Sequence, residues 1–168
     1  MSDTISFALF PLQIAVQSRL QAHPWLTDIP AITEAKGDIV NEVKRALGEL
    51  EGLNGKFGAC IVILTPTATL KYPDAPGPIL DGLSLVLSVI EHVELNQSEQ
   101  GTKKHALEIV EFCLRYLHHW TVPGSNAALC VQSTPFKIVN ADPLTYEVYF
   151  KTKLALKPES LTVVPLNP

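Results

Sequence analysis

The adjacent pair His118-His119 is the first place where this sequence could support metal or proton-transfer chemistry. Imidazole is a common metal ligand and titrates near neutral pH. In a helix expected over residues 103–120, however, adjacent side chains point about 100° apart, so two neighbouring rings do not readily bind one ion. No histidine or cysteine lies four residues away to complete a ligand set. We therefore predict a solvated charge ladder, in which Glu111, Arg115 and His119 follow one helical face.

Nucleophiles and paired carboxylates are the next candidates. Ser84 lies in GLSLV, which lacks the second glycine of a G-x-S-x-G nucleophile elbow and falls within an expected strand. Ser125 lies in the loop PGSNA, with no histidine and acid visibly arranged for it. Asp74 and Asp81 flank a proline-rich loop, where turn formation explains them as well as acid–base chemistry does. Since glycine-rich phosphate-binding patterns are also missing from the sequence, we predict no catalytic, cofactor-binding or metal-binding residues, and no enzyme.

The three cysteines do not form a recognisable framework. Cys60, Cys113 and Cys130 are widely spaced, each among apolar neighbours, without the C-x-x-C spacing of a zinc site. We predict free thiols that pack as small hydrophobic side chains, as suits a reducing cytoplasm.

A small α+β ligand-binding domain or enzyme remains the alternative. It would place a pocket between helix 103–120 and the sheet and use His105, His118 or Cys113. Glu91 and Cys113 are the only polar groups that the apolar pattern directs inward. An adaptor or chaperone-like dimer is a third alternative.

Composition narrows the remaining classes. The chain has 168 residues, a length typical of one domain, and 46% of them are hydrophobic, which excludes a disordered chain. Thirteen Lys+Arg against seventeen Asp+Glu give a net charge of −4 without a basic run, which argues against a nucleic-acid-binding groove. No apolar stretch approaches the ~20 residues that cross a bilayer, and the N-terminus does not resemble a signal peptide. We expect a soluble, unprocessed protein.

Hydrophobic periodicity predicts a single α+β domain over residues 1–156, followed by an extended tail over 157–168. We expect a mostly antiparallel sheet of about four strands, a long helix packed on one face, and one or two N-terminal helices. The expected helices are 11–22, 38–50 and 103–120, the expected strands are 57–65, 80–95, 129–139 and 144–156, and the expected irregular loop is 66–79.

Several boundaries follow from single residues. Asp38 or Gly37 is the expected N-cap of the second helix, with Gly52 and Gly55 ending it, and Thr102 is the expected N-cap of the third. Strand 80–95 alternates cleanly and is long enough to need a bulge near Gly82 or to extend beyond the domain body. The apolar positions expected to share a face of the first helix are Phe7, Pro11, Ile14, Ala15, Ser18 and Leu20, and those of strand 80–95 are Leu83, Leu85, Leu87, Val89, Val93 and Leu95, with Glu91 as the polar exception.

The large aromatic side chains and the tail are candidates for contacts between subunits. Trp25, Trp120, Tyr146 and Phe150 are expected in the core or in a subunit interface. The tail contains the apolar run LTVVPL, and unpaired strand edges tend to be covered, often by a neighbouring chain. We predict that deletion of residues 158–168 weakens assembly.

The stretch VIEHVELNQSEQGTKKHALEIVEFCLRYLHHWTVPGSNAALCV, with the later hairpin LTYEVYFKTKLAL, resembles the tail terminator (tail-completion) proteins of long-tailed bacteriophages and related contractile particles. In that family a strand ends in a polar loop, a helix with a Leu–aromatic end follows, and a tryptophan with a nearby Pro-Gly leads into an antiparallel hairpin. The resemblance covers residues 10–156. The matching residues here are Gly101-Thr102, Leu117, Trp120, Pro123-Gly124 and Leu129.

The resemblance implies an α+β protomer without catalytic residues that assembles into a ring, commonly a hexamer. Such a ring caps the phage tail tube, stops its polymerisation and offers a docking surface to the head–tail connector. Its partners would be other copies of itself, the tail tube protein, the connector protein, and DNA that passes through the channel without specific binding. It would reside in the virion tail after assembly in the host cytoplasm, with no membrane contact.

Overall fold

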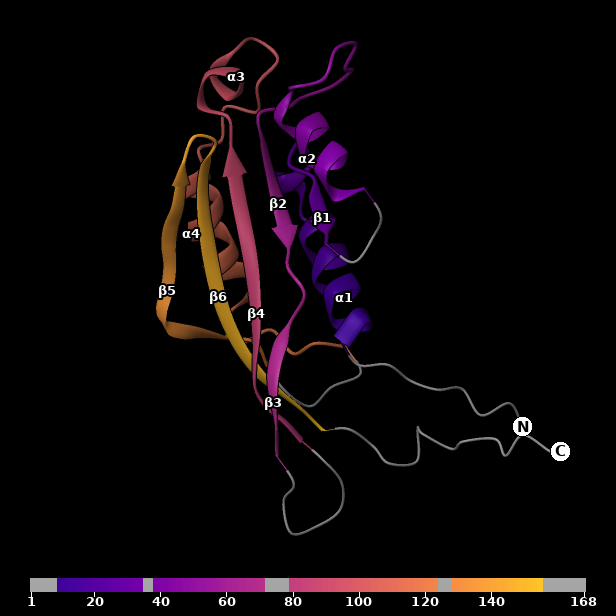
Figure 1. Cartoon of the computed structure of the whole chain (residues 1–168), viewed down its shortest axis with the longest axis vertical. Helices are drawn as coiled ribbons and strands as arrows, with labels where there is room; N and C mark the ends of the chain where they lie inside the picture. Colours follow the sequence, from indigo (N-terminus) through magenta and orange to yellow (C-terminus); the bar gives the residue numbers. More distant parts are fainter. Residues whose placement is uncertain (1–8, 35–37, 72–78, 124–127, 156–168) are drawn as a thin grey trace, which may run out of the picture.

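The computed structural model describes residues 9–34, 38–71, 79–123 and 128–155. They form an α+β fold around one six-stranded sheet of order β1-β2-β4-β6-β5, in which β3 pairs with β4 below β2 (Figure 1). The elements in chain order are α1 (Leu9–Gln21), the 3-10 helix η1 (Pro24–Leu26), β1 (Ala31–Thr33), α2 (Ile39–Leu47), β2 (Ala59–Ile63), β3 (Thr67–Lys71), β4 (Ile79–Glu91), α3 (Val93–Gln97), α4 (Ala106–Leu117), β5 (Cys130–Ala141) and β6 (Leu144–Ala155).

The sheet is mixed and has six strands, so the prediction of about four antiparallel strands is wrong in number. β1 pairs with β2 in parallel, whereas the other four strand pairs are antiparallel. β1 was not expected, because three residues are too few to show a period. β3 lies inside the loop 66–79 that we expected to be irregular, since the short run TATLK stands between prolines and forms a strand there.

The core fills both faces of the sheet around β2. On one face, α1 and α4 pack against alternate residues of β2, β4 and β6; on the other, α2 covers β1 and β2. β2 is fully buried along its length, which confirms the prediction of a central strand covered on both sides. The predicted apolar face of β4 is also confirmed at Leu83, Leu85, Leu87 and Val89, none of which is exposed.

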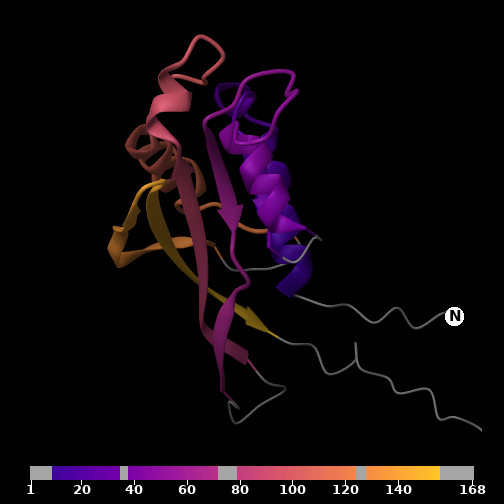
Figure 2. The same cartoon turned by 45° about the horizontal axis from the view of Figure 1, so that its top comes forward.

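β4 is the longest strand and joins the two halves of the sheet. Its 13 residues extend over about 43 Å. The expected irregularity is confirmed, because the register with β6 shifts between Leu80 and Leu83, where Gly82 has a φ of 61°. Figures 1 and 2 show that β3, together with the lower ends of β4 and β6, projects below the helices as a three-stranded ribbon.

Two of the predicted boundaries around α4 are wrong. The strand expected to run to residue 95 ends at Glu91, and α3 follows it, because His92 caps this helix by accepting a hydrogen bond from the backbone of Leu95. Helix 103–120 is shorter than expected. It begins after His105 rather than at Thr102, since Lys103 has a φ of 60°, and it ends at Leu117.

The N-terminal helices are present, with changes in their faces and ends. Asp38 caps α2 as expected, accepting from the backbone amide of Asn41, but Gly48 ends the helix instead of Gly52 or Gly55. The predicted apolar face of α1 is wrong. Ser18 is exposed, and the residues of α1 that are buried are Leu12, Gln13, Val16 and Leu20.

Candidate functional site

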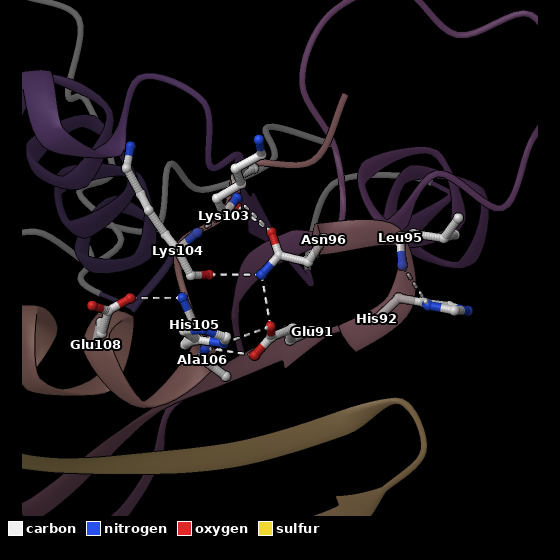
Figure 3. Close-up of polar contacts among 10 residues, drawn as sticks. Glu91, His92, Leu95, Asn96, Lys103, Lys104, His105, Ala106 and Glu108 are labelled. Atoms are coloured by element: carbon white, nitrogen blue, oxygen red, sulfur yellow. Dashed lines mark hydrogen bonds and ion pairs between the residues drawn. The ribbon is translucent and has the colours of Figure 1, made fainter. Parts of the chain in front are cut away.

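The most completely buried polar cluster joins the end of β4 to the start of α4 (Figure 3). The Glu91 side chain is 1% exposed. Its Oε1 accepts a hydrogen bond of 2.6 Å from Nδ2 of Asn96, and its Oε2 accepts one of 2.7 Å from the backbone amide of Ala106. Nδ1 of His105 lies 3.4 Å from Oε1. The carboxylate therefore stands at the N-terminus of α4, where the helix dipole favours negative charge.

Asn96 holds the other side of this cluster. It is fully buried, and besides Glu91 its Nδ2 donates to the carbonyl of Lys104 at 2.9 Å. Its Oδ1 accepts from the hydroxyl of Thr102 at 2.6 Å and from the backbone amide of Lys103 at 3.0 Å. All the hydrogen-bonding capacity of this amide is in use, and the segment 101–105 is tied to α3 by it.

Two glycines allow the chain to approach Asn96 so closely. A Cβ on Gly58, where φ is 104°, would lie 2.4 Å from Cα of Asn96, and a Cβ on Gly101 would lie 1.8 Å from its carbonyl oxygen. Any other residue at either position would push α3 away from β2. The two glycines thus belong to the same structural unit as the buried amide.

This cluster supports structure better than chemistry. Each side-chain oxygen and nitrogen of Glu91 and Asn96 has an internal hydrogen-bonding partner, as buried polar groups require. Within residues 9–34, 38–71, 79–123 and 128–155, no group of three or more His, Cys, Asp or Glu side chains could hold a metal ion. The sequence pattern had singled out Glu91 as an inward-facing polar residue, which the burial confirms. It missed Asn96, which we had placed in a polar loop.

The histidine pair lies beyond the helix, so the helical argument that kept the two rings apart is wrong. His118 follows the last residue of α4 in extended conformation, His119 has a φ of 60°, and the ring centroids are 3.8 Å apart. Nδ1 of His118 accepts a hydrogen bond of 3.2 Å from the backbone amide of Val131 in β5. The expected charge ladder is confirmed at one step, the exposed Glu111–Arg115 ion pair of 2.6 Å.

The other candidate side chains are not brought together. Ser84 lies within β4 as expected, and its Oγ accepts a hydrogen bond of 2.9 Å from Nε2 of Gln132. Asp81 lies in β4 opposite Thr69. Asp74 and Ser125 fall outside the described residues, as does the tail over 157–168.

The interface between α4 and the sheet, where the alternative prediction placed a pocket, contains closely packed apolar side chains. Ala106, Ile109, Val110, Cys113 and Leu117 are at most 1% exposed and belong to the main core. Burial raises the pKa of the Cys113 thiol to about 12, and that of the Cys60 thiol likewise to about 12. Free, buried thiols are thereby confirmed at both positions, whereas Cys130 is free but half-buried.

Aromatic residues of α4 and η1, with Trp120, form a half-buried cluster with two cations, Arg19 and Lys104, the second of which lies 5.1 Å from the ring centroid of Trp25. The Arg19 guanidinium lies 4.2 Å from the ring centroid of Tyr116 and 4.8 Å from that of Trp120. Trp25 stacks on Phe112 with centroids 4.9 Å apart. These contacts hold α1 and η1 against α4. Phe150 is fully buried in the core, and Trp25, Trp120 and Tyr146 pack against the same core.

The edges of the sheet differ in how they are covered. Along β1, α1 presents two glutamines: Nε2 of Gln17 donates to the carbonyl of Ala31 at 2.8 Å, and Gln21 donates to the same carbonyl at 3.3 Å. A third glutamine of α1, Gln13, donates to the carbonyl of Leu64 just after β2 at 3.0 Å. At the other side, β5 pairs with β6 alone among the strands that the structure describes, and it exposes large apolar residues, which are Phe136 (37%), Ile138 (57%) and Val139 (51%).

Comparison with known proteins finds neither a protein-family model that matches this chain nor a curated protein that matches its sequence. Among the helices of the described segments, none combines the length and the apolar character required to span a membrane.

Proposed function

We propose that the protein is a tail terminator: a structural protein that forms a ring, commonly a hexamer, and caps the tail tube of a phage or prophage-derived particle. The order of elements along residues 79–155 carries the proposal. A long strand, the short helix α3, a polar loop, the helix α4, a break near Trp120 and a hairpin follow one another there. Apart from α3, this is the order of the family that the sequence resembles.

Two features of the structure support an assembly role. The ribbon made of β3 and the lower ends of β4 and β6 projects beyond the helices (Figure 1), so strand backbone extends away from the core that stabilises it. The buried polar groups of the Glu91–Asn96 cluster are saturated by internal donors and hold elements together. In the proposed ring the tail tube protein binds one face and the head–tail connector the other. The net charge of −4 lets DNA pass through the channel without adhering.

The experiment is to measure the solution mass by light scattering across a concentration series, alone and with tail tube protein, and to follow tube length. A closed ring near six copies that stops tube growth is the expected result. A protein that neither binds the tube nor changes its length, in any oligomeric state, would contradict the proposal. The alternative, a ligand-binding domain or enzyme with a pocket between residues 103–120 and the sheet, is the prediction that a ligand screen would then address.

A further inference from the structure

The sheet has two open strand edges on opposite sides. β3 pairs only with β4, and β5 pairs only with β6, in the part of the chain that the structure describes. The third edge, at β1, is covered by the glutamines of α1. An open edge presents a row of backbone donors and acceptors that can pair with another chain.

The open edge of β5 is also unusually apolar. Of the eight large hydrophobic side chains exposed in the described chain, Phe136, Ile138 and Val139 lie within four consecutive residues of this strand. Phe136, Lys137 and Ile138 keep a continuous register with β6, between a shift that ends at Phe136 and another at Val139. On β3 the exposed residues Thr67, Ala68 and Thr69 carry no charge. Natural edges are usually protected by charges, prolines or bulges. β5 carries Lys137, Pro135 and two register shifts, and β3 carries a register shift between Thr67 and Thr69, so the three residues from Phe136 to Ile138 are the regular part of the β5 edge.

We propose that the β5 edge around Phe136–Ile138 of one copy pairs with the β3 edge of the next copy, so that the sheet continues from subunit to subunit. This inference rests on the proposed ring and names the surfaces that build it. Each copy uses its β5 edge to contact one neighbour and its β3 edge to contact the other, which is a heterologous contact. Heterologous contacts form a closed ring when the rotation from one copy to the next divides a full turn.

Strand direction supports this pairing. The steps from β3 to β4, from β4 to β6 and from β6 to β5 are all antiparallel, so β3 and β5 of one copy run in opposite directions. A neighbouring copy related by rotation about a ring axis therefore presents its β3 antiparallel to β5, without being inverted. The alternation of strand direction in the sheet therefore continues across the contact between two copies.

The two edges lie at different heights, which predicts the shape of the joint. Asp81 of β4 faces Thr69 of β3, whereas Ile138 lies in the row of Tyr146 and Val89, eight residues further along β4 (89 − 81). Successive copies are thus offset by about 26 Å along the strands. Such a stagger is what a closed sheet requires, and it tilts the strands relative to the ring axis.

A second copy also explains both edges together. Pairing of β5 with β5 about a two-fold axis would cover one edge in a closed dimer and leave β3 open. Pairing of β5 with β3 covers both edges of every copy when the ring closes. This is why we assign a neighbouring copy, rather than an unrelated extended peptide, to the β5 edge.

Cysteine cross-linking with a short bis-maleimide tests the pairing directly. The full-length chain carries Cys130→Ser to remove the accessible thiol, and Thr69→Cys, Ile138→Cys or both are added. The double variant should give a ladder of cross-linked species that ends at the ring size. An equal mixture of the two single variants should stop at cross-linked dimers, and neither single variant alone should cross-link.

The other outcomes overturn the pairing and are separable from the proposed function. Dimers formed by the Ile138→Cys variant alone would indicate β5–β5 pairing. A ring by light scattering without cross-links in the double variant would reject these edges while leaving the ring. A chain that stays monomeric and uncross-linked at all concentrations rejects this pairing in solution, and the tube-capping assay decides the function by itself.

A charge placed on the edge provides an independent measurement. Ile138→Lys should lower the solution mass to that of a monomer, with little change in the thermal midpoint, because the side chain is 57% exposed. Val40→Lys is the matched control, since Val40 is also β-branched and 58% exposed but lies on α2. If both variants keep the wild-type mass, the β5 edge is not an interface.

Discussion

The β1 edge and the β5 edge border the same sheet, but the first is covered by other parts of the chain and the second is exposed. β1 is three residues long, fully buried, and its outward carbonyl at Ala31 receives amide hydrogens from Gln17 and Gln21. β5 has 12 residues, all of them half-exposed or exposed, and besides the β6 pairing its backbone amide at Val131 donates to the side chain of His118. The first edge is closed by the chain itself, whereas the second is available to another chain.

The difference shows how one helix can determine which edge of a sheet assembles. Gln13, Gln17 and Gln21 follow one another at four-residue spacing and therefore lie along one face of α1. At β1, the amides of Gln17 and Gln21 provide a donor that a further strand would otherwise supply, and Gln13 does the same at the end of β2. With that side closed, β5 and the projecting β3 are the edges on which the proposed association depends.

The largest contrast between the two sides should appear in thiol reactivity, because Cys60 lies in β2 beside the closed edge and Cys130 lies in β5. With a pKa of about 12, the Cys60 thiol is ionised in about one molecule in 10⁴ at pH 8. Since thiolates are the reactive form, we expect the native protein to react with a chromogenic disulfide reagent at one thiol per chain, Cys130. In denaturant, all three should react. Rapid reaction of Cys60 in the native state, identified by mass spectrometry of the labelled peptide, would show that the β2 side opens.

The next largest effect is expected at Glu91, which anchors β4, the strand between the two sides. Glu91→Ala removes the acceptor from Nδ2 of Asn96 and from the amide of Ala106, leaving two buried donors unpaired. We expect the free energy of unfolding, measured by urea titration, to fall by about 3 kcal/mol. Glu108→Ala, at the exposed side of the same helix start, is the control and should cost less than half as much. Equal losses of unfolding free energy in the two variants would mean that the buried cluster around Glu91 does not stabilise the fold more than Glu108 does.

The contribution of α1 to this side of the sheet is tested by Gln13→Ala. Gln13 is 2% exposed, and its amide donates to the carbonyls of Ile63 and Leu64 at the end of β2. Its loss leaves these carbonyls without that donor and should lower the free energy of unfolding by about 2 kcal/mol. Gln21→Ala removes an exposed, longer hydrogen bond to a carbonyl that Gln17 also serves, so a change within about 0.5 kcal/mol is expected. Similar effects at both positions would reject the view that Gln13 is the stronger of the two supports that α1 gives to this side of the sheet.

Much of the framework could be predicted from the sequence because its signals are local. The apolar run of β2, the alternation along β4 and β6, and the cap at Asp38 follow from residue types at short spacing. Glu91 could be recognised because a charged residue interrupts an apolar face. These positions needed no knowledge of what lies opposite them.

The features that the sequence did not predict depend on contacts between residues that are distant in the chain. The burial of Gln13 was not predicted, because the carbonyls that accept from its amide lie 50 and 51 residues away, in Ile63 and Leu64. The sequence around Asn96 is that of a polar loop. Its burial depends on Gly58 and Gly101, whose lack of a side chain allows their backbone to approach Asn96 closely. Short strands such as β1 are stabilised by their neighbours and show no period of their own.

The smallest effect is expected where the open strand begins, at the histidine pair. His118→Ala removes the acceptor for the backbone amide of Val131, a bond at the surface that water can replace, so the free energy of unfolding should fall by about 0.5 kcal/mol. His119→Asn is the matched control, because asparagine tolerates the left-handed conformation of this residue and no hydrogen bond of the ring is lost.

Amide hydrogen exchange separates the two variants more sharply than unfolding does. Val131 should exchange faster in His118→Ala alone, because its amide loses its partner, while the amides of β2 keep their protection in both variants. Unchanged exchange at Val131 would mean that β5 is held at this end by β6 alone.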